Sequence, residues 1–230
     1  MLQSVDEMVE AIMNSLEETG ELDNTYIFFT SENGIHMGQH RLKRGKLSAY
    51  EEDVRVPMII RGPGVSAGYR VDQIAGNVDL AATFADIGQV MMPNESDGHS
   101  LLPLLDKNHP VENWRQVYLL ERWPLSWNDN DASNEQGEGI LEPPDPNEIS
   151  DQTGKVIPIP AFKGIRTLDY AFIKYDTGEI ELYDMINDPY QLDNLYPNAD
   201  PLLINSLTNL LDKMASCQGN ECWITSISNP

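Results

Sequence analysis

The feature that most constrains the fold is a short apolar run that ends in residue types suited to metal binding. The run Tyr26–Phe29 is rich in aromatic and β-branched residues, which favour strands. It is soon followed by a carboxylate, a carboxamide and a glycine: Glu32, Asn33 and Gly34. In open α/β sheets, ligands bind beyond the carboxyl ends of strands, and side-chain oxygens there suit a hard divalent cation. We therefore interpret Glu32 and Asn33 as candidate metal ligands.

A dense group of hydrogen-bond donors follows this turn: His36, His40, Arg41, Lys43, Arg44 and Lys46. A second apolar run, 56–60, comes after the donors and has the composition of a buried strand. Metal ligands beside a cationic loop are typical of a site that processes an anion. Taken alone, the same residues also fit a plain turn followed by a solvated loop.

The ordered motifs of this stretch resemble the type I sulfatases. The matching residues are Thr30-Ser31-Glu32-Asn33-Gly34, His36-x-Gly38-Gln39-His40-Arg41-Leu42, Gly45-Lys46 and Tyr50-Glu51-x-Asp53-x-Arg55-Val56-Pro57. The resemblance is closest to the branch acting on sulfated sugars, such as N-acetylglucosamine-6-sulfatase and the heparan sulfatases. It continues through a later run, Glu181-Leu182-Tyr183-Asp184-Met185-x-x-Asp188-Pro189-Tyr190-x-x-x-Asn194-Leu195, and so covers most of the chain.

The resemblance implies an α/β fold of the alkaline-phosphatase-like (sulfatase) type. On this interpretation, residues 1–110 are the C-terminal part of the catalytic α/β domain. Residues 111–230 then form a small antiparallel subdomain with a C-terminal helix and an acidic insertion at 128–151. We expect a soft boundary between these two parts at 106–114.

The resemblance also implies roles for individual residues. Glu32 and Asn33 stand where the family has its last two calcium ligands, although the usual residue at the first position is Asp. The residues with an implied catalytic role are Lys46, His40 and His36. Those with an implied role in substrate binding are Lys46, which stands at the sulfate-contacting lysine, His40 and Arg41. A structural alternative is that Arg41 and Arg55 pair with nearby acids, namely Glu51, Glu52 or Asp53.

The residues that start the reaction in the resembled family are missing from this sequence. The family's nucleophile is a formylglycine made from the Cys of a C-x-P-S-R motif, beside an Asp-Asp pair that supplies further calcium ligands. Neither Cys217 nor Cys222 lies in such a motif. We therefore expect the chain to be the C-terminal portion of a sulfatase that is inactive alone. Its expected partners are a sulfated carbohydrate and the missing N-terminal half of the catalytic domain.

Two other classes of protein remain possible at this stage. A phosphatase or phosphodiesterase of the same superfamily needs zinc-ligand clusters of His and Asp, and the sequence has four scattered histidines. A non-catalytic, sugar-binding relative of the sulfatases needs no nucleophile. Ser100, in Gly98-His99-Ser100-Leu101, lacks both a G-x-S-x-G elbow and a partnered base, so we do not expect it to be a nucleophile.

Composition narrows the range of partners and locations. The net charge of −22 argues against nucleic-acid binding, which needs clustered cations. The sequence contains neither an apolar run of about 18 residues nor a recognisable signal peptide. Secretion or lysosomal localisation therefore follows only from the resemblance, with which a lone glycosylation sequon at Asn94 is consistent. Cys217 and Cys222 suit a small disulfide loop, with two unpaired thiols as the alternative.

Apolar periodicity predicts the remaining elements. Spacings of three and four residues predict a helix at 2–19, which together with the strand after it implies a parallel sheet whose other strands are mostly missing from this chain. A second helix is expected at 77–87, capped by Asn77. Strand-like runs fall at 116–123 and across 162–185, where a turn signal at 176–179 predicts an antiparallel meander. A final helix is expected at 200–215, with the core face Leu203, Leu207, Leu210, Leu211 and Met214.

Overall fold

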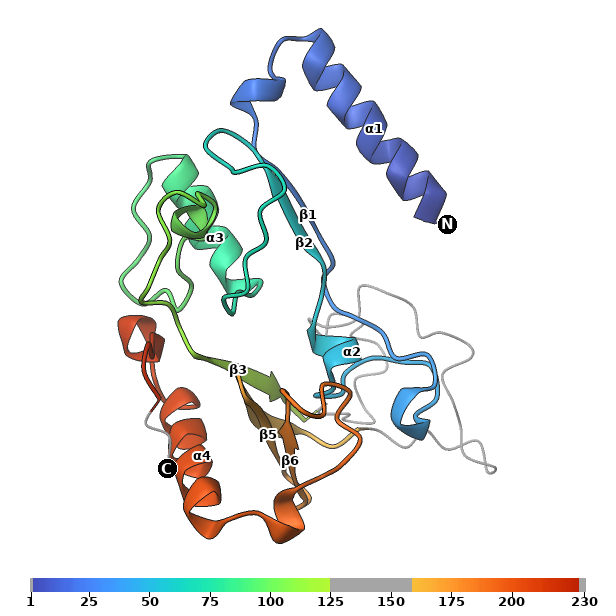
Figure 1. The fold of residues 1–230 in the computed structure, drawn as a ribbon, viewed down its shortest axis with the longest axis vertical. Helices are drawn as coiled ribbons and strands as arrows, with labels where there is room; N and C mark the ends of the chain where they lie inside the picture. Colours follow the sequence, from blue (N-terminus) through green and yellow to red (C-terminus); the bar gives the residue numbers. More distant parts are fainter. Residues whose placement is uncertain (1, 125–158, 228–230) are drawn as a thin grey trace, which may run out of the picture. The chain divides into compact units, whose positions relative to one another are not determined.

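The computed structural model describes residues 2–124 and 159–227, so the predicted acidic insertion lies outside the described residues. The chain divides into two compact units. Unit 1 comprises Met1–Glu32 and Val56–Asn113, and unit 2 comprises Asn33–Arg55 and Trp114–Pro230. Figure 1 shows the elements of both units, which are described one at a time below. The division assigns the loop between the two apolar runs to the C-terminal unit.

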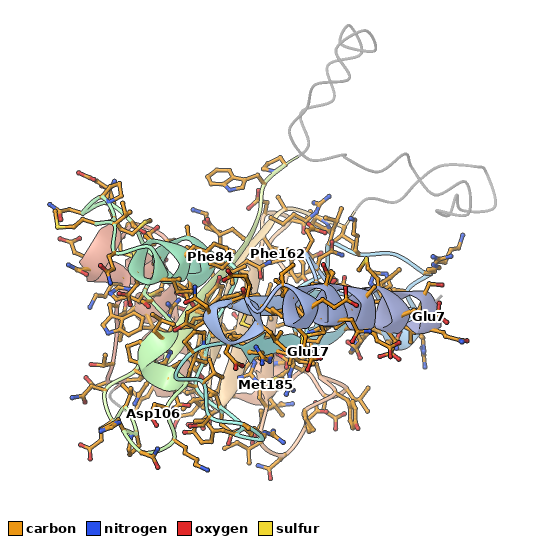
Figure 2. The ribbon with its side chains drawn as sticks, turned by 90° about the horizontal axis from the view of Figure 1, so that it is seen from above. Glu7, Glu17, Phe84, Asp106, Phe162 and Met185 are labelled. Carbon is orange, nitrogen blue, oxygen red and sulfur yellow. A yellow bond between two sulfur atoms is a disulfide. The ribbon has the colours of Figure 1, made fainter. Side chains whose placement is uncertain are left out.

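Unit 1 begins with helix α1 (Leu2–Glu18), as the spacing of its apolar residues predicts. The helix stops before Gly20, whose φ of +75° is a left-handed conformation that favours glycine. None of its residues is buried, and Leu2, Met8 and Ile12 are 85%, 55% and 47% exposed. Figure 2 shows Glu7 and Glu17 standing out along the same helix. The apolar stripe of α1 is therefore uncovered among the described residues.

The two apolar runs form strands β1 (Ile27–Thr30) and β2 (Met58–Arg61), which pair with each other. The pair is antiparallel, with Phe28 opposite Ile60. The parallel strands that the sequence implies were expected mostly outside this chain, and the one strand pair of unit 1 that the structure describes is antiparallel. Helix-then-strand periodicity establishes the elements but not which strand lies alongside, because that depends on contacts far apart in the sequence.

Helix α3 (Val78–Ile87) confirms the second predicted helix but begins differently from the expectation. Asn77 stands at the N-cap position, yet its side chain makes no capping bond there and instead donates to the backbone oxygen of Glu32 at 3.0 Å. The buried carboxylate of Asp79 accepts from the backbone nitrogens of Gly76 and His99, both at 2.9 Å. Asp79, the second residue of the helix, therefore holds the segments around Gly76 and His99 against the start of α3. Near the C-terminal end of α3, the Asp86 carboxylate accepts a hydrogen bond from the Ser100 hydroxyl at 2.6 Å.

Unit 2 contains a four-stranded antiparallel sheet in sequence order, as the strand-like runs predict. Its strands are β3 (Val117–Arg122), β4 (Phe162–Thr167), β5 (Tyr170–Tyr175) and β6 (Ile180–Asp184). Strand residues alternate between the two faces, so each strand contributes to two separate cores. Gly178, at φ +102°, allows the tight turn between β5 and β6.

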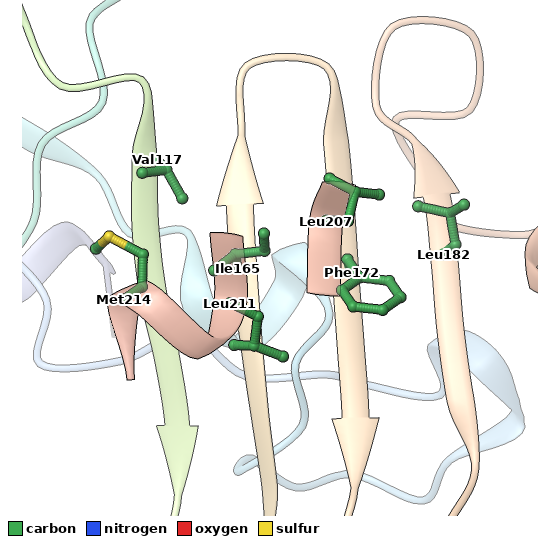
Figure 3. Packing of buried hydrophobic residues seen from close by; sticks show 7 residues of the cluster. All are labelled: Val117, Ile165, Phe172, Leu182, Leu207, Leu211 and Met214. Carbon is green, nitrogen blue, oxygen red and sulfur yellow. The ribbon is translucent and has the colours of Figure 1, made fainter. Parts of the chain in front are cut away.

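One face of this sheet is covered by helix α4 (Pro201–Met214), which Asp200 caps by accepting from the backbone nitrogen of Leu202. Figure 3 shows the three buried helix residues, Leu207, Leu211 and Met214, over the sheet. They pack on one residue from each strand, namely Val117, Ile165, Phe172 and Leu182. The predicted core face of the final helix is confirmed, with Leu203 and Leu210 at its partly buried margin.

The opposite face has a second core, which includes Phe162, Ala171, Ile173, Tyr183 and Met185. Ala49, from the loop between β1 and β2, is 2% exposed and belongs to this core, with Tyr50 packed against it. The sheet therefore lies between a helix from its own end of the chain and a segment that precedes it by more than sixty residues.

The end of the chain is tied to the same unit. Cys217 and Cys222 form the predicted disulfide. The backbone nitrogen of Gln116 donates to the carbonyl of Ile224 at 2.8 Å, and the rings of Trp114 and Trp223 meet edge to face. Across residues 2–124 and 159–227, every helix is too short or too polar to cross a membrane.

Candidate functional site

The loop Asn33–Arg55 contains most of the predicted site residues, and its first turn is held by close backbone contact. Gly34 donates its backbone nitrogen to the carbonyl of Asp53 at 2.8 Å. A Cβ atom at Gly34 would lie 1.9 Å from the carbonyl oxygen of Glu52, so glycine is required there. The turn that begins at Asn33 is therefore closed against the short helix α2 (Glu51–Val54).

His36 lies inside this loop. It is 3% exposed, and its Nδ1 is 2.9 Å from both carboxylate oxygens of Asp53, which is 5% exposed. Asp53 also accepts from the backbone nitrogen and the hydroxyl of Ser48, at 2.8 and 2.6 Å. The His36 backbone pairs with Gly45 in an isolated bridge. This buried network fixes the two ends of the cationic stretch to each other.

Asn33 and Lys46, thirteen residues apart, are brought together by that closure. The Lys46 ammonium donates to the Asn33 side-chain oxygen at 3.4 Å, in a partly buried setting. A carboxamide oxygen is a hard ligand for a divalent cation, and an ammonium group is a compact binder of anions. The structure thus places one predicted metal ligand beside the predicted sulfate-binding lysine.

Glu32, the other predicted metal ligand, is an exposed residue at the end of unit 1, joined to Asn33 by the peptide bond where the two units meet in sequence. Glu32 and Asn33 are oxygen donors of the kind that calcium prefers, but calcium takes six to eight such ligands. No group of three or more His, Cys, Asp or Glu residues able to hold a metal occurs in the described parts of the chain. Glu32 and Asn33 therefore provide ligands of the type that calcium prefers, but fewer ligands than a calcium ion needs.

His40 occupies an unusual backbone conformation. Both His40 and Arg41 are left-handed, with φ of +54° and +59°, which is uncommon for residues other than glycine and is concentrated at functional sites. The His40 ring lies on that of Tyr50, with centroids 3.7 Å apart and planes 7° apart. Its Nε2 is 3.3 Å from Oε2 of Glu52. The imidazole is 8% exposed, whereas Arg41 is an exposed residue.

Two arginines, Arg55 and Arg166, pair with Glu51, and the sequence predicted only the first of these pairs. Arg55 pairs with Glu51 at 3.6 Å, as the structural alternative for that arginine proposed. The stronger partner of Glu51 is Arg166 on β4, whose Nε donates to the carboxylate at 2.8 Å. Gln191, itself 2% exposed, accepts from the Glu51 backbone nitrogen at 2.7 Å. Sequence reasoning did not identify Arg166 or Gln191, because both lie more than a hundred residues away.

A tyrosine cluster around Glu181 was also not anticipated. The hydroxyls of Tyr50 and Tyr175 donate to opposite oxygens of the Glu181 carboxylate, at 3.3 and 3.1 Å. Burial and the neighbouring Glu181 charge raise the pKa of Tyr50 from 10.0 to about 12. The same two causes raise the pKa values of Tyr175 and Tyr183. Strand alternation places Tyr175, Glu181 and Tyr183 on one face of the sheet. This alternation was the sequence signal from which the cluster could have been predicted.

Comparisons with known proteins show which sequences and folds this chain resembles. The sulfatase family model matches residues 1–90. The N-acetylglucosamine-6-sulfatase of Homo sapiens is 32% identical over the whole chain, which covers 42% of that relative. The extracellular sulfatase SULF-1 homolog of Drosophila melanogaster is 53% identical over 122 residues, which are 52% of this chain and 11% of that relative.

A solved structure supports the same assignment. A protein in complex with its substrate D-glucosamine-2-N,6-O-disulfate superposes with a TM-score of 0.75 at 30% identity. The likeness covers 93% of this chain and 38% of that one. The fold and the sequence therefore define an α/β chain of the alkaline-phosphatase-like type. Within that class the chain is similar to the sulfatases, and it spans about two fifths of the length of the N-acetylglucosamine-6-sulfatases that it matches.

Proposed function

We propose that this chain is part of a sulfuric ester hydrolase that acts on sulfated sugars or glycosaminoglycans, such as N-acetylglucosamine 6-sulfate. The observation that supports the proposal most directly is the Lys46–Asn33 pair, which lies in the stretch that matches the sulfatase family model. The named substrate of the solved relative, a sulfated glucosamine, supports the sugar branch of the family. The proposal assigns Lys46 to the sulfate oxygens, where a point charge suits a compact anion.

The other loop residues have supporting roles in this proposal. His40 and Arg41 contact the substrate, and His36 acts from within the loop by fixing the position of Lys46 through Asp53 and Ser48. Glu32 and Asn33 are two ligands of a calcium ion whose other ligands lie outside this chain. When bound, calcium neutralises negative charge on the sulfate group. The longer side chain of Glu32 suits calcium better than magnesium, which demands a stricter geometry.

We further propose that a formylglycine nucleophile lies outside these 230 residues. The chain has no C-x-P-S-R motif and covers about two fifths of the N-acetylglucosamine-6-sulfatases. On this proposal, the described chain does not hydrolyse sulfate esters alone and needs the preceding half of the catalytic domain. The Cys217–Cys222 disulfide is consistent with a secreted or lysosomal enzyme, since such bonds persist in oxidising compartments.

The first test is to read the transcript upstream of Met1 for an in-frame Asp-Asp pair and C-x-P-S-R motif. The polypeptide that includes them is then assayed with calcium for release of sulfate from N-acetylglucosamine 6-sulfate and of phosphate from the matching 6-phosphate. We expect sulfate release by the extended polypeptide and none by the 230-residue chain. Preferred phosphate release would indicate a phosphatase, and release of neither product would indicate a non-catalytic relative.

A matched pair of substitutions tests the assigned lysine. Lys46→Ala in the extended polypeptide is expected to lower kcat/KM by about 100-fold, the usual effect of losing a charge that stabilises a transition state. Lys107→Ala removes an equally charged but exposed residue of unit 1 and serves as the control. Equal effects of the two substitutions would contradict the role of Lys46.

A further inference from the structure

The stacked His40–Tyr50 pair is held by the C-terminal sheet. Tyr50 packs against the core on the sheet face opposite α4, and its ring meets that of Tyr183 at an angle of 62°. Glu181 and Tyr183 pair with Ile173 and Ala171 on β5, both of which belong to the same core. The Glu181 carboxylate therefore lies on the face of the sheet that receives the loop.

The Glu181 carboxylate is bound on both of its oxygens. Oε1 accepts from Tyr50 at 3.3 Å and Oε2 from Tyr175 at 3.1 Å. Tyr175 comes from β5, an interior strand of the sheet, whereas Tyr50 comes from the loop. A carboxylate that accepts hydrogen bonds from both hydroxyls links Tyr50 of the loop to Tyr175 of the sheet. Hydrogen bonds to a charged acceptor are stronger than those between neutral groups.

The opposite end of this chain of contacts is the imidazole of His40. Tyr50 presents one ring face to His40 at 3.7 Å, so any rotation of the Tyr50 ring must move the histidine or break the stack. The left-handed backbone of His40 and Arg41 adds strain that needs such a restraint. The salt bridge of Glu51 with Arg166 and the Gln191 contact anchor the next residue and do not contact the Tyr50 ring.

We infer that Glu181 is a positioning residue, which orients the His40 imidazole for the substrate by holding the Tyr50 ring. In this inference Glu181 acts through the Tyr50 ring, to whose hydroxyl its carboxylate is bound. This inference rests on the proposed function, which makes His40 a substrate contact. The orientation of His40 by Glu181 is a separate physical statement about this chain, and it can be tested without any activity.

The test measures the ring-proton shifts of the histidines by NMR in the 230-residue chain. The ring current of Tyr50 displaces the His40 signals, and we expect Glu181→Ala to move them toward the values of an exposed histidine. Glu181→Gln keeps one acceptor and one donor for the two hydroxyls and is expected to preserve the shifts. Glu179→Ala, an exposed acid two residues away, is the matched control and is expected to change nothing. Signals of His99 and His109, both in unit 1, report whether an effect is local.

Unchanged His40 shifts in Glu181→Ala would overturn the inference. If that variant fails to fold, Tyr175→Phe decides the question, because it removes only the hydroxyl that anchors Glu181. We expect Tyr175→Phe to move the His40 signals in the same direction as Glu181→Ala, and unchanged signals would count against the inference.

The extended polypeptide then links orientation to activity. Glu181→Ala is expected to lower kcat/KM by about 10- to 100-fold, the effect of a misplaced substrate contact. In a polypeptide that already has His40→Ala, we expect Glu181→Ala to cause no further loss of kcat/KM. Additive effects would overturn the link between the two residues. An unsubstituted polypeptide without sulfate-ester hydrolysis would refute the proposed function, while the ring shifts would still decide whether Glu181 orients His40.

Discussion

The imidazole of His40 lies parallel to the phenol ring of Tyr50, 3.7 Å away between centroids. Tyr50 is at once part of the loop that contains Asn33 and Lys46 and part of the core of the C-terminal sheet. The candidate site residues of unit 2 are therefore supported by strands that come after residue 160. This relationship makes the stability of the sheet a condition for the geometry of the loop.

The network of Asp53 is the main support within the loop. Replacing Asp53 with Ala leaves His36 Nδ1 and the two donors of Ser48 without their acceptor inside a buried site. We expect Asp53→Ala to lower the free energy of unfolding of unit 2 by about 3 kcal/mol. Urea unfolding followed by tryptophan fluorescence measures this, because all four tryptophans have numbers within unit 2.

Arg55→Ala is the control for Asp53→Ala. Arg55 is two residues away, and its side chain is 73% exposed. Surface substitutions of this kind usually change stability by less than about 0.5 kcal/mol. A similar loss in both variants would contradict a special role for the Asp53 network.

Alkaline pH should weaken unit 2. The folded-state pKa of Tyr50 is about 12, against 10.0 for an ordinary tyrosine, so the native state retains its proton longer than the unfolded state. The stabilising contribution is complete below pH 10.0 and is lost as the pH rises from there through about 12. Tyr175 and Tyr183 act in the same direction. Urea unfolding across this range, with tyrosinate absorbance recorded in parallel, measures the loss.

The Glu181→Gln variant should reduce this alkaline effect, because it removes the charge that is the second-largest cause of the Tyr50 shift. Burial, the largest cause, remains, so part of the effect is expected to persist. A stability profile that is flat between pH 10 and 12 in the unsubstituted chain would contradict the prediction.

The hydrophobic contact between α4 and the sheet should contribute most to the stability of unit 2. Leu211 is 3% exposed and contributes to the core with Val117, Ile165 and Phe172. Leu211→Ala is expected to cost about 2–5 kcal/mol through lost burial and the cavity left behind. Leu202→Ala makes the same chemical change on the same helix at a side chain that is 67% exposed, and it should cost far less. Chemical denaturation of the two variants, side by side, measures the difference.

The disulfide should contribute modestly. Cys217 and Cys222 are separated by five positions, and closing so short a loop stabilises a protein by about 2 kcal/mol. Replacing both cysteines with Ser is expected to lower the free energy of unfolding by that amount, as measured by the same fluorescence method. Reduction of the unsubstituted chain should have the same effect, whereas reduction of the double variant should have none.

The sequence by itself determined the helices, the strands and the family resemblance. Periodicity located α1, α3, α4 and the meander of unit 2, because amphipathic spacing depends on neighbours within a few residues. The ordered motifs between Glu32 and Pro57 were enough to indicate a resemblance to the sulfatases, which the comparisons confirm. The roles of Glu32, Asn33, His36, His40, Arg41 and Lys46 remain predictions that the experiments above address.

The tertiary structure decided which residues support the site. It paired β1 with β2 in antiparallel fashion, directed the Asn77 side chain to the backbone of Glu32 instead of a helix cap, and grouped the loop Asn33–Arg55 with the C-terminal sheet. The contacts of Tyr50 with Glu181 and of Glu51 with Arg166 join residues more than a hundred positions apart. Local pattern contains no information on such pairs, because they form only where packing brings two distant segments to one face of a sheet.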